Sequence, residues 1–364
     1  MGISHIKYPS QRDTIKLGND IGTKSNPLTT LSRITIPTGV TFDGNSKKIH
    51  IAIPDFEGTI NLTGGTIKNL SLISDNDISN NVNTTGYITN TGAYGFIYDC
   101  YTNANTYGVC TGCIVGTVGG DLTISGCVSS GDIIGALSGG IVGYIEYESN
   151  LTIDKCYATG NLYGGSGIGG IIGTIVFSTS ITINDCYYVG TNADILRNGG
   201  IANLYWDNSA WTSHSTVVSI NRCYSIGKNA TIIGSETEAN VDYALVNYCV
   251  AETIVNTGTL KPGSTGNSTT LSDIEGKLYE PSGDASGNWD SDIWTVGNGT
   301  NYPILNRFTT SPWNNYFYYK NIATFSKPVN PIKLTGNFAG KSYPEHTAFI
   351  VSVMKKIKNG TIFD

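Results

Sequence analysis

The stretch 139-GGIVGYIEYESNLTIDKCY-157 contains both parts of a pattern that the chain repeats. It opens with a glycine box around two apolar residues, and it closes with an alternating run that leads into a cysteine. Three further boxes start at residues 112, 169 and 199, so successive boxes start 27, 30 and 30 residues apart. A fixed period of this length is typical of proteins built from stacked structural repeats.

A cysteine closes each copy of the pattern at the same place. The residues before it alternate between Leu, Ile or Val and Thr or Ser, which favours short β-strands. With degenerate copies at both ends of the array, six cysteines are in register: Cys100, Cys127, Cys156, Cys186, Cys223 and Cys249. We expect them to be buried thiols that pack as small apolar groups, with a ladder of disulfides as the alternative.

The length of the repeat selects the fold. Roughly 30 residues suit one coil of three short strands with corners, whereas helical repeats would need long stretches of 3.6-residue periodicity, which the chain lacks. Turn-forming residues mark one corner, two positions before the cysteine: Ser125, Asp154, Asn184, Asn221 and Asn247. Glycines mark a second corner, four positions after it, where we expect positive φ: Gly131, Gly160, Gly190 and Gly227. The sequence therefore predicts an all-β protein, a right-handed parallel β-helix (solenoid) with terminal caps and extensions.

Changes of pattern divide the chain into four parts. Residues 1–56 are predicted to be an N-terminal arm with cap strands, which include a hairpin-like pair that turns at Asp43-Gly44-Asn45. Residues 57–258 hold the coils of the β-helix, and residues 259–308 are predicted to close the array. Residues 309–364 form a C-terminal extension rich in aromatic and basic residues.

Composition limits the classes of partner. The chain has 364 residues with 45 glycines, a net charge of −6 and a pI of about 5.2. An acidic chain argues against general binding to nucleic acid, which requires a basic surface. No run of about 18 apolar residues is present, so no membrane-spanning helix is expected. The first residues lack the apolar segment of a secretory signal, and we expect synthesis in the cytoplasm.

The repeat resembles a known family. The Gly-Gly-Ile-Val-Gly box, the Thr-Ile-x-x-Cys-Tyr strand and the corner Ala158-Thr159-Gly160-Asn161 resemble the GLUG-type repeats of adhesin-like parallel β-helix proteins. Trp294-Thr295-Val296, leading to Tyr302-Pro303-Ile304-Leu305, resembles the segment that often ends such arrays. The resemblance covers residues 57–308. It implies a surface protein of bacteria or a protein encoded by a large DNA virus, and it says little about activity.

Parallel β-helices also include pectate lyases and glycoside hydrolases, which use carboxylates on one outer face. Asp154 and Asp185 are expected near one corner of adjacent coils and are the best candidate pair for cleaving a glycosidic bond. Their columns also hold Ser, Asn, Lys and Arg, which suits a structural corner better. We therefore expect a protein that is not an enzyme, with a polysaccharide lyase or glycoside hydrolase as the alternative.

Two other motifs have a possible chemical role. Trp206 and Trp211, on an insertion before Cys223, are candidates for stacking on sugar rings, as in a glycan-binding adhesin. Cys110-Thr111-Gly112-Cys113 has the spacing of a redox or zinc motif, but no second pair accompanies it, and Cys113 replaces a glycine of its box. No metal and no cofactor are expected.

The C-terminal extension differs from the body in charge. Its seven lysines against Glu345 and Asp364 give +5, which leaves −11 for residues 1–308. We expect this tail to dock on other structural proteins, such as capsid or surface subunits, or on a second copy of the chain. The predicted contact residues are Trp313, Tyr316, Phe317, Tyr318, Tyr319 and Phe349. The function expected is that of a structural protein of a virus particle, with the cell surface as the alternative location.

Overall fold

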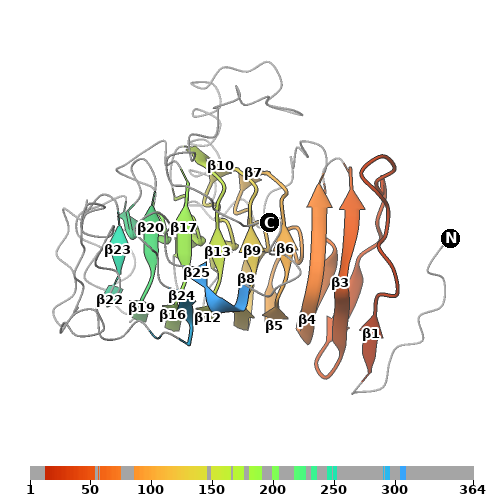
Figure 1. Cartoon of the computed structure of the whole chain (residues 1–364), viewed down its shortest axis with the longest axis horizontal. Coiled ribbons are helices and arrows are strands. Elements are labelled where there is room, and N and C mark those ends of the chain that lie inside the picture. The colour runs from red at the N-terminus through yellow and green to blue at the C-terminus, as the bar shows by residue number, and fades with distance from the viewer. Residues whose placement is uncertain are drawn as a thin grey trace, which may run out of the picture.

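The computed structural model describes residues 13–53, 56, 58–74, 86–145, 149–164, 167–175, 180–190, 199–204, 217–226, 231–235, 244–247, 249–251, 290, 292–295 and 304–308. Within these ranges the regular secondary structure is β-strand apart from one short 3₁₀ helix, and twenty strands join one sheet. Every strand pair in that sheet is parallel, from β1 at one end to β22 and β23 at the other. Figure 1 shows the strands side by side along the long axis, so the chain is a parallel β-helix, as predicted.

Each coil contributes strands to three walls. The wall before the cysteines consists of β1 (Thr14–Lys16), β3 (Thr41–Ile51), β4 (Ile60–Ser74), β5 (Ala93–Tyr98), β8 (Val115–Ser125), β12 (Asn150–Asp154), β16 (Ser180–Asn184), β19 (Val217–Asn221) and β22 (Ala244–Asn247). The wall after them consists of β6 (Tyr101–Thr102), β9 (Val128–Ser129), β13 (Tyr157–Ala158), β17 (Tyr187–Val189), β20 (Tyr224–Ile226) and β23 (Val250–Ala251), together with the ends of β3 and β4. The glycine-box wall consists of β2 (Ile34–Pro37), β11 (Val142–Ile145), β15 (Ile172–Ile175), β18 (Ala202–Leu204) and β21 (Ile233–Ser235), together with the beginnings of β4 and β8. A separate small sheet contains β7 (Thr106–Val109), β10 (Ile133–Ala136) and β14 (Leu162–Gly164).

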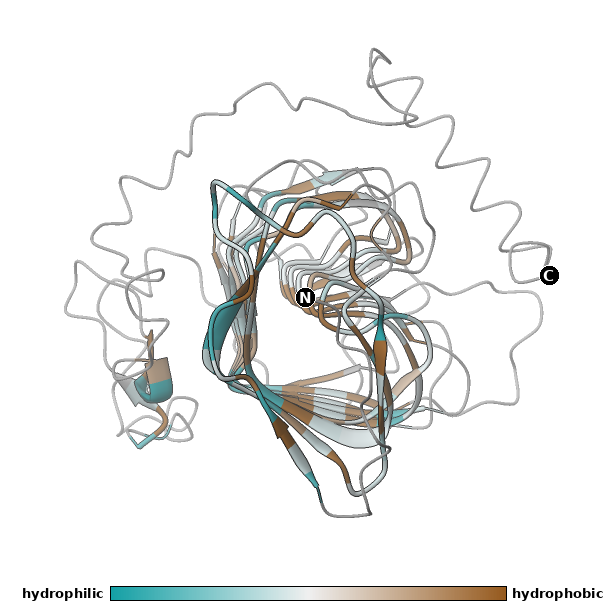
Figure 2. Cartoon of the chain, turned by 90° about the vertical axis from the view of Figure 1, so that its right-hand side faces the viewer, coloured by the Kyte–Doolittle hydropathy of each residue, from teal (hydrophilic) through white to brown (hydrophobic). Residues whose placement is uncertain are grey.

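Identical positions of successive coils lie in register and fill the core. Ile153 of β12 aligns with Ile124 of β8 and with Ile183 of β16, and all three side chains are fully buried. The six predicted cysteines are also buried, as thiols rather than disulfides, so this prediction is confirmed. Viewed along the stack in Figure 2, the walls of successive coils lie one behind another around the enclosed core. Each coil therefore depends on its neighbours to complete its apolar contacts.

The corner before the cysteines combines a ladder of amides with a left-handed residue. Asn247 donates from Nδ2 to Asn221 Oδ1 at 2.8 Å, and Asn221 donates in the same way to Asn184 at 2.9 Å. The predicted ladder is therefore present. The left-handed residue comes one position later, directly before the cysteine, and it is Lys155, Asp185 or Arg222 with φ between 50° and 52°. This left-handed residue ends the alternation of inward and outward side chains along the strand, so the cysteine that directly follows it is buried in the core.

The glycines of the second corner serve a purpose different from the one predicted. Gly131, Gly160 and Gly190 do not have positive φ, and Gly227 lies outside the described residues. Instead, a Cβ on Gly160 would lie 1.6 Å from the carbonyl oxygen of Gly131, and a Cβ on Gly131 would lie 1.8 Å from that of Ala104. Glycine is required here because the backbones of adjacent coils approach too closely for any side chain.

The N-terminal part joins the stack earlier than predicted. β3 continues through Asp43-Gly44-Asn45 and pairs in parallel with β4, so the predicted hairpin is wrong. β1 pairs in parallel with β3, and Ile21 forms a parallel bridge with Ile49. The described residues from Asp13 to Ile53 therefore belong to the first coils of the stack rather than to a separate arm.

Candidate functional site

Asp154, the first of the two candidate catalytic acids, is part of the corner ladder. It ends β12 and aligns with Ser125 on one side and Asn184 on the other. Its carboxylate accepts a hydrogen bond from Ser125 Oγ at 3.4 Å and forms an ion pair with Lys155 Nζ at 2.8 Å. Both side chains of this pair are partly exposed to solvent. Asp154 thus occupies a polar position at the surface that is already paired with a cation.

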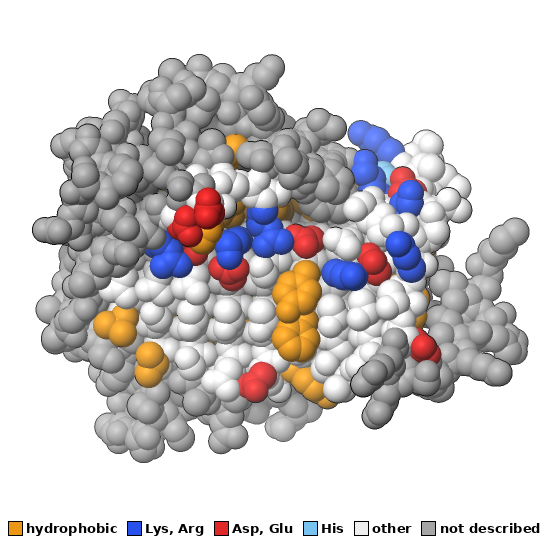
Figure 3. Space-filling model, turned by 60° about the horizontal axis from the view of Figure 1, so that its bottom comes forward, with side chains coloured by type: hydrophobic (Ala, Val, Ile, Leu, Met, Phe, Trp, Pro, Cys, Tyr) orange, Lys and Arg blue, Asp and Glu red, His pale blue; other side chains and the backbone are white. Residues whose placement is uncertain are grey.

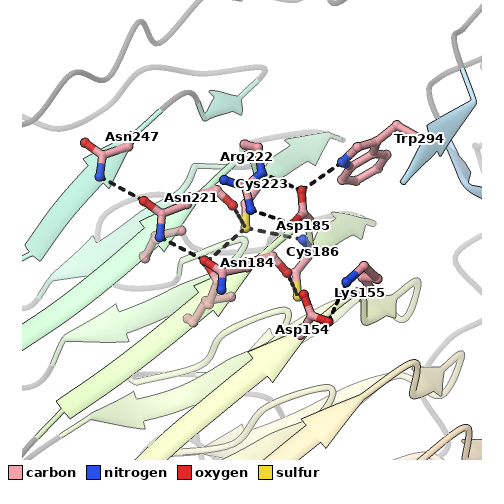
Figure 4. A network of polar contacts seen from close by, with 12 residues as sticks. Asp154, Lys155, Asn184, Asp185, Cys186, Asn221, Arg222, Cys223, Asn247 and Trp294 are labelled. Carbon is pink, nitrogen blue, oxygen red and sulfur yellow. Dashed lines mark hydrogen bonds and ion pairs between the residues drawn. The ribbon is translucent and has the colours of Figure 1, made fainter. Parts of the chain in front are cut away.

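Asp185, the second candidate, is almost completely buried at the left-handed corner after β16, with 2% of its side chain exposed. Arg222 of the next coil binds it with two hydrogen bonds, from Nε to Oδ1 at 2.8 Å and from Nη2 to Oδ2 at 2.7 Å. Trp294 Nε1 donates a third hydrogen bond to Oδ1 at 3.0 Å (Figure 4). The bond to Asp185 raises the pKa of the Arg222 guanidinium above its ordinary value, although burial acts against it.

The two carboxylates are placed differently in the stack. They belong to different columns, because Asp154 aligns with Asn184 and Asp185 comes one residue later in its coil. Glycosidic cleavage requires one carboxyl that holds a proton and a second that faces the substrate or a water. Here each carboxylate is engaged by its own cation, Lys155 or Arg222. The structure therefore places each of the two carboxylates in an ion pair of its own.

The partner of Asp185 from outside the coils belongs to a small unit on the flank of the β-helix. We call this unit the clasp; it consists of Asp290, residues 292–295 with β24 (Trp294–Thr295), and β25 (Ile304–Leu305), followed by a 3₁₀ helix (Asn306–Phe308). β24 and β25 pair antiparallel. In Figure 1 the clasp, in blue, lies across the coils rather than beyond the last one.

The clasp covers a column of tyrosines that directly follow the cysteines. Tyr157, Tyr187 and Tyr224 are stacked with ring centroids 4.5 Å and 4.7 Å apart, and they form an apolar cluster separate from the main core. Trp294 packs against this column 5.8 Å from Tyr224, and Phe308 meets Tyr157 edge to face at 4.8 Å. The tyrosines are buried, so this outer row becomes a second core under the clasp.

Arg307 attaches the clasp to earlier coils. It forms an ion pair with Asp99 and donates from Nη1 to Ser125 Oγ at 3.0 Å. A Cβ on Gly126, the left-handed residue of that coil, would lie 2.2 Å from the guanidinium carbon. Residues 259–308 were expected to close the array, but their described part ties together the coils between Asp99 and Arg222.

The Cys110-x-x-Cys113 motif forms part of the apolar core. Both side chains are buried, and Cys113 Sγ donates a weak hydrogen bond to the Ala104 carbonyl oxygen at 3.5 Å. Burial raises the pKa of Cys113 to about 12, so this thiol is far from the thiolate that redox chemistry or zinc binding requires. Among the residues that the structure describes, no group of three or more His, Cys, Asp and Glu side chains is placed to hold a metal ion.

Several predicted sites cannot be placed. Trp206 and Trp211 lie outside the described residues, as do all the predicted assembly contacts: Trp313, Tyr316, Phe317, Tyr318, Tyr319 and Phe349. These sites remain predictions. In the described part of the chain, no helix has the length and apolar character needed to cross a membrane.

Sequence reasoning missed the residues that hold the clasp, namely Arg222, Trp294 and Arg307. One signal was available, because a tyrosine follows the cysteine in three consecutive coils, at positions 157, 187 and 224. An outward row of tyrosines would expose a large apolar surface, which predicts that a segment from elsewhere in the chain packs over it.

Comparisons with protein-family models, with curated proteins and with solved structures found no match for this chain.

Proposed function

We propose that this chain is a non-enzymatic structural protein whose rigid β-helix presents its surfaces to other proteins. The observation that supports this proposal is the bonding of Asp185. The better buried of the two candidate acids is held by Arg222 and Trp294, so its charge stabilises the junction between coils and clasp. A carboxylate in this position orders the scaffold and has no free oxygen to direct at a substrate.

Within this class, we propose a minor capsid or surface component of a virus particle. The Asn- and Ile-rich composition and the resemblance of the repeats to GLUG-type β-helix proteins support this location. The partners proposed are other capsid or surface subunits. The tail would make the contacts to them, because a basic and aromatic segment beside an acidic body is suited to docking on another protein. Mass spectrometry of purified particles tests the location directly, and absence of the chain from the particles would overturn it.

The role of the tail is tested by truncation after Phe308. The full chain and the truncated chain are each mixed with dissociated particle proteins, and incorporation is followed by sedimentation. We expect the truncated chain to remain folded and monomeric while failing to assemble, because the described coils and clasp end at Phe308. Equal incorporation of both chains would contradict a docking role for the tail.

The enzymatic alternative is tested with the intact chain on acidic and neutral polysaccharides. Release of unsaturated or reducing ends that disappears in Asp154→Asn or Asp185→Asn would overturn the non-enzymatic proposal. The Asp154→Asn variant is the more informative, because its carboxylate is partly exposed and its loss leaves the clasp in place. A polysaccharide that binds without being cleaved would be consistent with the further inference below.

A further inference from the structure

An aromatic row crosses the outer face of the wall before the cysteines. Residues of β5 alternate between buried and outward positions, and its three outward residues are Tyr94, Phe96 and Tyr98. Tyr94 is 40% exposed and Phe96 is 44% exposed, whereas most large apolar side chains of the described coils are buried. The rings of Phe96 and Tyr98 are 6.1 Å apart and nearly parallel, with 21° between their planes. We call these three residues the aromatic strip.

The strip is one strand wide and lies between polar or very small neighbours. Phe96 aligns with Thr66 of β4 and with Thr123 of β8, while Gly64 and Gly120 lie against Tyr94. Outward hydroxyls continue along the same column to Thr152 and Thr182. Figure 3 shows the hydrophobic side chains as a band across this face, between broad polar areas and with charged side chains along one edge.

These surroundings distinguish between possible ligands. The centre of a protein interface is a continuous apolar patch, but here both sides of the strip are Thr, Gly, Ser or Lys. Single-stranded nucleic acid also stacks on aromatic rings, but it needs a positive surface, and the chain has a net charge of −6. A sugar chain needs flat rings for its apolar C–H faces, and hydroxyl or amide groups beside them for its own hydroxyls. The strip provides both.

The charges near the strip favour a neutral sugar. Lys68 aligns with Tyr98, but its ammonium pairs with Asp43 at 3.7 Å. Arg307 of the clasp, which reaches Ser125 beside Tyr98, pairs with Asp99. Because both cations are paired with carboxylates, their attraction for an acidic polysaccharide is reduced.

We infer that the aromatic strip binds a neutral glycan, whose sugar rings stack along β5 while the neighbouring Thr rows bond to its hydroxyls. Alternate residues on a strand are separated by about 6.7 Å, so the strip is about 13 Å long and suits a short run of consecutive sugars. This site is independent of the proposed assembly role, because it lies on the coils rather than on the tail.

The test uses the full chain and a panel of neutral probes: cellohexaose, xylohexaose, mannohexaose and chitohexaose, together with insoluble cellulose and chitin. Binding is measured by calorimetry for the soluble probes and by depletion for the insoluble ones. The test variant is Tyr94→Ala with Phe96→Ala. The matched control is Val217→Ala, because Val217 is 39% exposed on β19 of the same wall, away from the strip. Thermal melting confirms that each variant is folded.

We expect at least one neutral probe to bind, the double variant to bind about tenfold more weakly or worse, and the Val217→Ala control to bind normally. Binding should be insensitive to salt, since screening acts on charges. Three results would each overturn the inference: no binding to any probe, equal binding by the double variant, or binding confined to acidic polysaccharides and lost in salt. Loss of incorporation into particles by the double variant, without any glycan binding, would assign the strip to a protein partner instead.

Discussion

Replacing Arg222 with alanine would leave the buried carboxylate of Asp185 without its cation. In the native chain, Asp185 accepts two hydrogen bonds from Arg222 and one from Trp294, and only 2% of its side chain is exposed. After the replacement, only the indole N–H of Trp294 remains among these three donors. The carboxylate must then take up a proton, draw in water or loosen the clasp.

The expected cost follows from the geometry. Removing one partner of a fully buried ion pair typically costs about 3–5 kcal/mol. Arg222 is 26% exposed and Trp294 stays bonded, so water can replace part of the lost interaction, and we expect about 2–3 kcal/mol. Lys155→Ala removes a corner cation of the adjacent coil in the same way, but that pair lies at the surface, and its loss should cost less than about 1 kcal/mol.

Urea unfolding of the wild-type, Arg222→Ala and Lys155→Ala chains measures both costs. Adding Asp185→Asn to the Arg222→Ala variant should recover part of the lost free energy of unfolding, because a neutral amide leaves no buried charge. The reasoning fails if Arg222→Ala is no more destabilising than Lys155→Ala. It also fails if adding Asp185→Asn to Arg222→Ala lowers the free energy of unfolding again, by as much as the loss of another ion pair would.

Three further predictions concern the coils. Ile153→Asp places a charge between Ile124 and Ile183, and hydrogen exchange should show several coils losing protection together, whereas loss confined to one coil would contradict the stacked core. Gly160→Ala should lower the melting temperature because its Cβ meets the backbone of the preceding coil, while Gly18→Ala, where nothing lies within 4 Å, should leave it unchanged; equal melting of the two would be contrary evidence. Because burial raises the pKa of Cys113 to about 12, this thiol ionises at a lower pH in the unfolded chain than in the folded one. Its contribution to the free energy of unfolding is therefore fully present below about pH 9 and is lost as the pH rises towards 12. Cys113→Ala should remove that thiol's share of the slope, about 1.4 kcal/mol per pH unit at most, in urea midpoints measured against pH, and an unchanged slope would refute it.

The fold could be predicted because each coil repeats the same physical pattern. Alternation before the cysteine defined the strands, and the box spacing defined the coil, so the column of Ile124, Ile153 and Ile183 was foreseen with its register. The details of the corners were less accessible. Asn tolerates a left-handed backbone, but here the ladder of amides holds the Asn side chains, and the next residue takes the left-handed conformation.

Candidate sites were harder to predict because they depend on contacts between distant segments. Asp185 and Trp294 are 109 residues apart in the sequence, and no local sequence pattern predicts their hydrogen bond. Asp154 and Asp185 were correctly placed at one corner region, but their environments are set by Lys155, Arg222 and the clasp. Tyr94, Phe96 and Tyr98 alternate visibly in the sequence, but residues 96–100 by themselves predict only a degenerate copy of the cysteine strand.

Engineered disulfides test the stacking register most directly. Thr152 and Thr182 are aligned partners in adjacent parallel strands, so their Cα atoms should be about 4.8 Å apart, within the range that a disulfide can bridge. Thr123 and Thr182 lie two coils apart, at about 9.6 Å, which exceeds that range. The parallel β-helix predicts that the folded Thr152→Cys/Thr182→Cys chain forms the crosslink on mild oxidation and that the Thr123→Cys/Thr182→Cys chain does not. Crosslinking of the second pair as readily as the first, or failure of the first, would contradict the in-register stack.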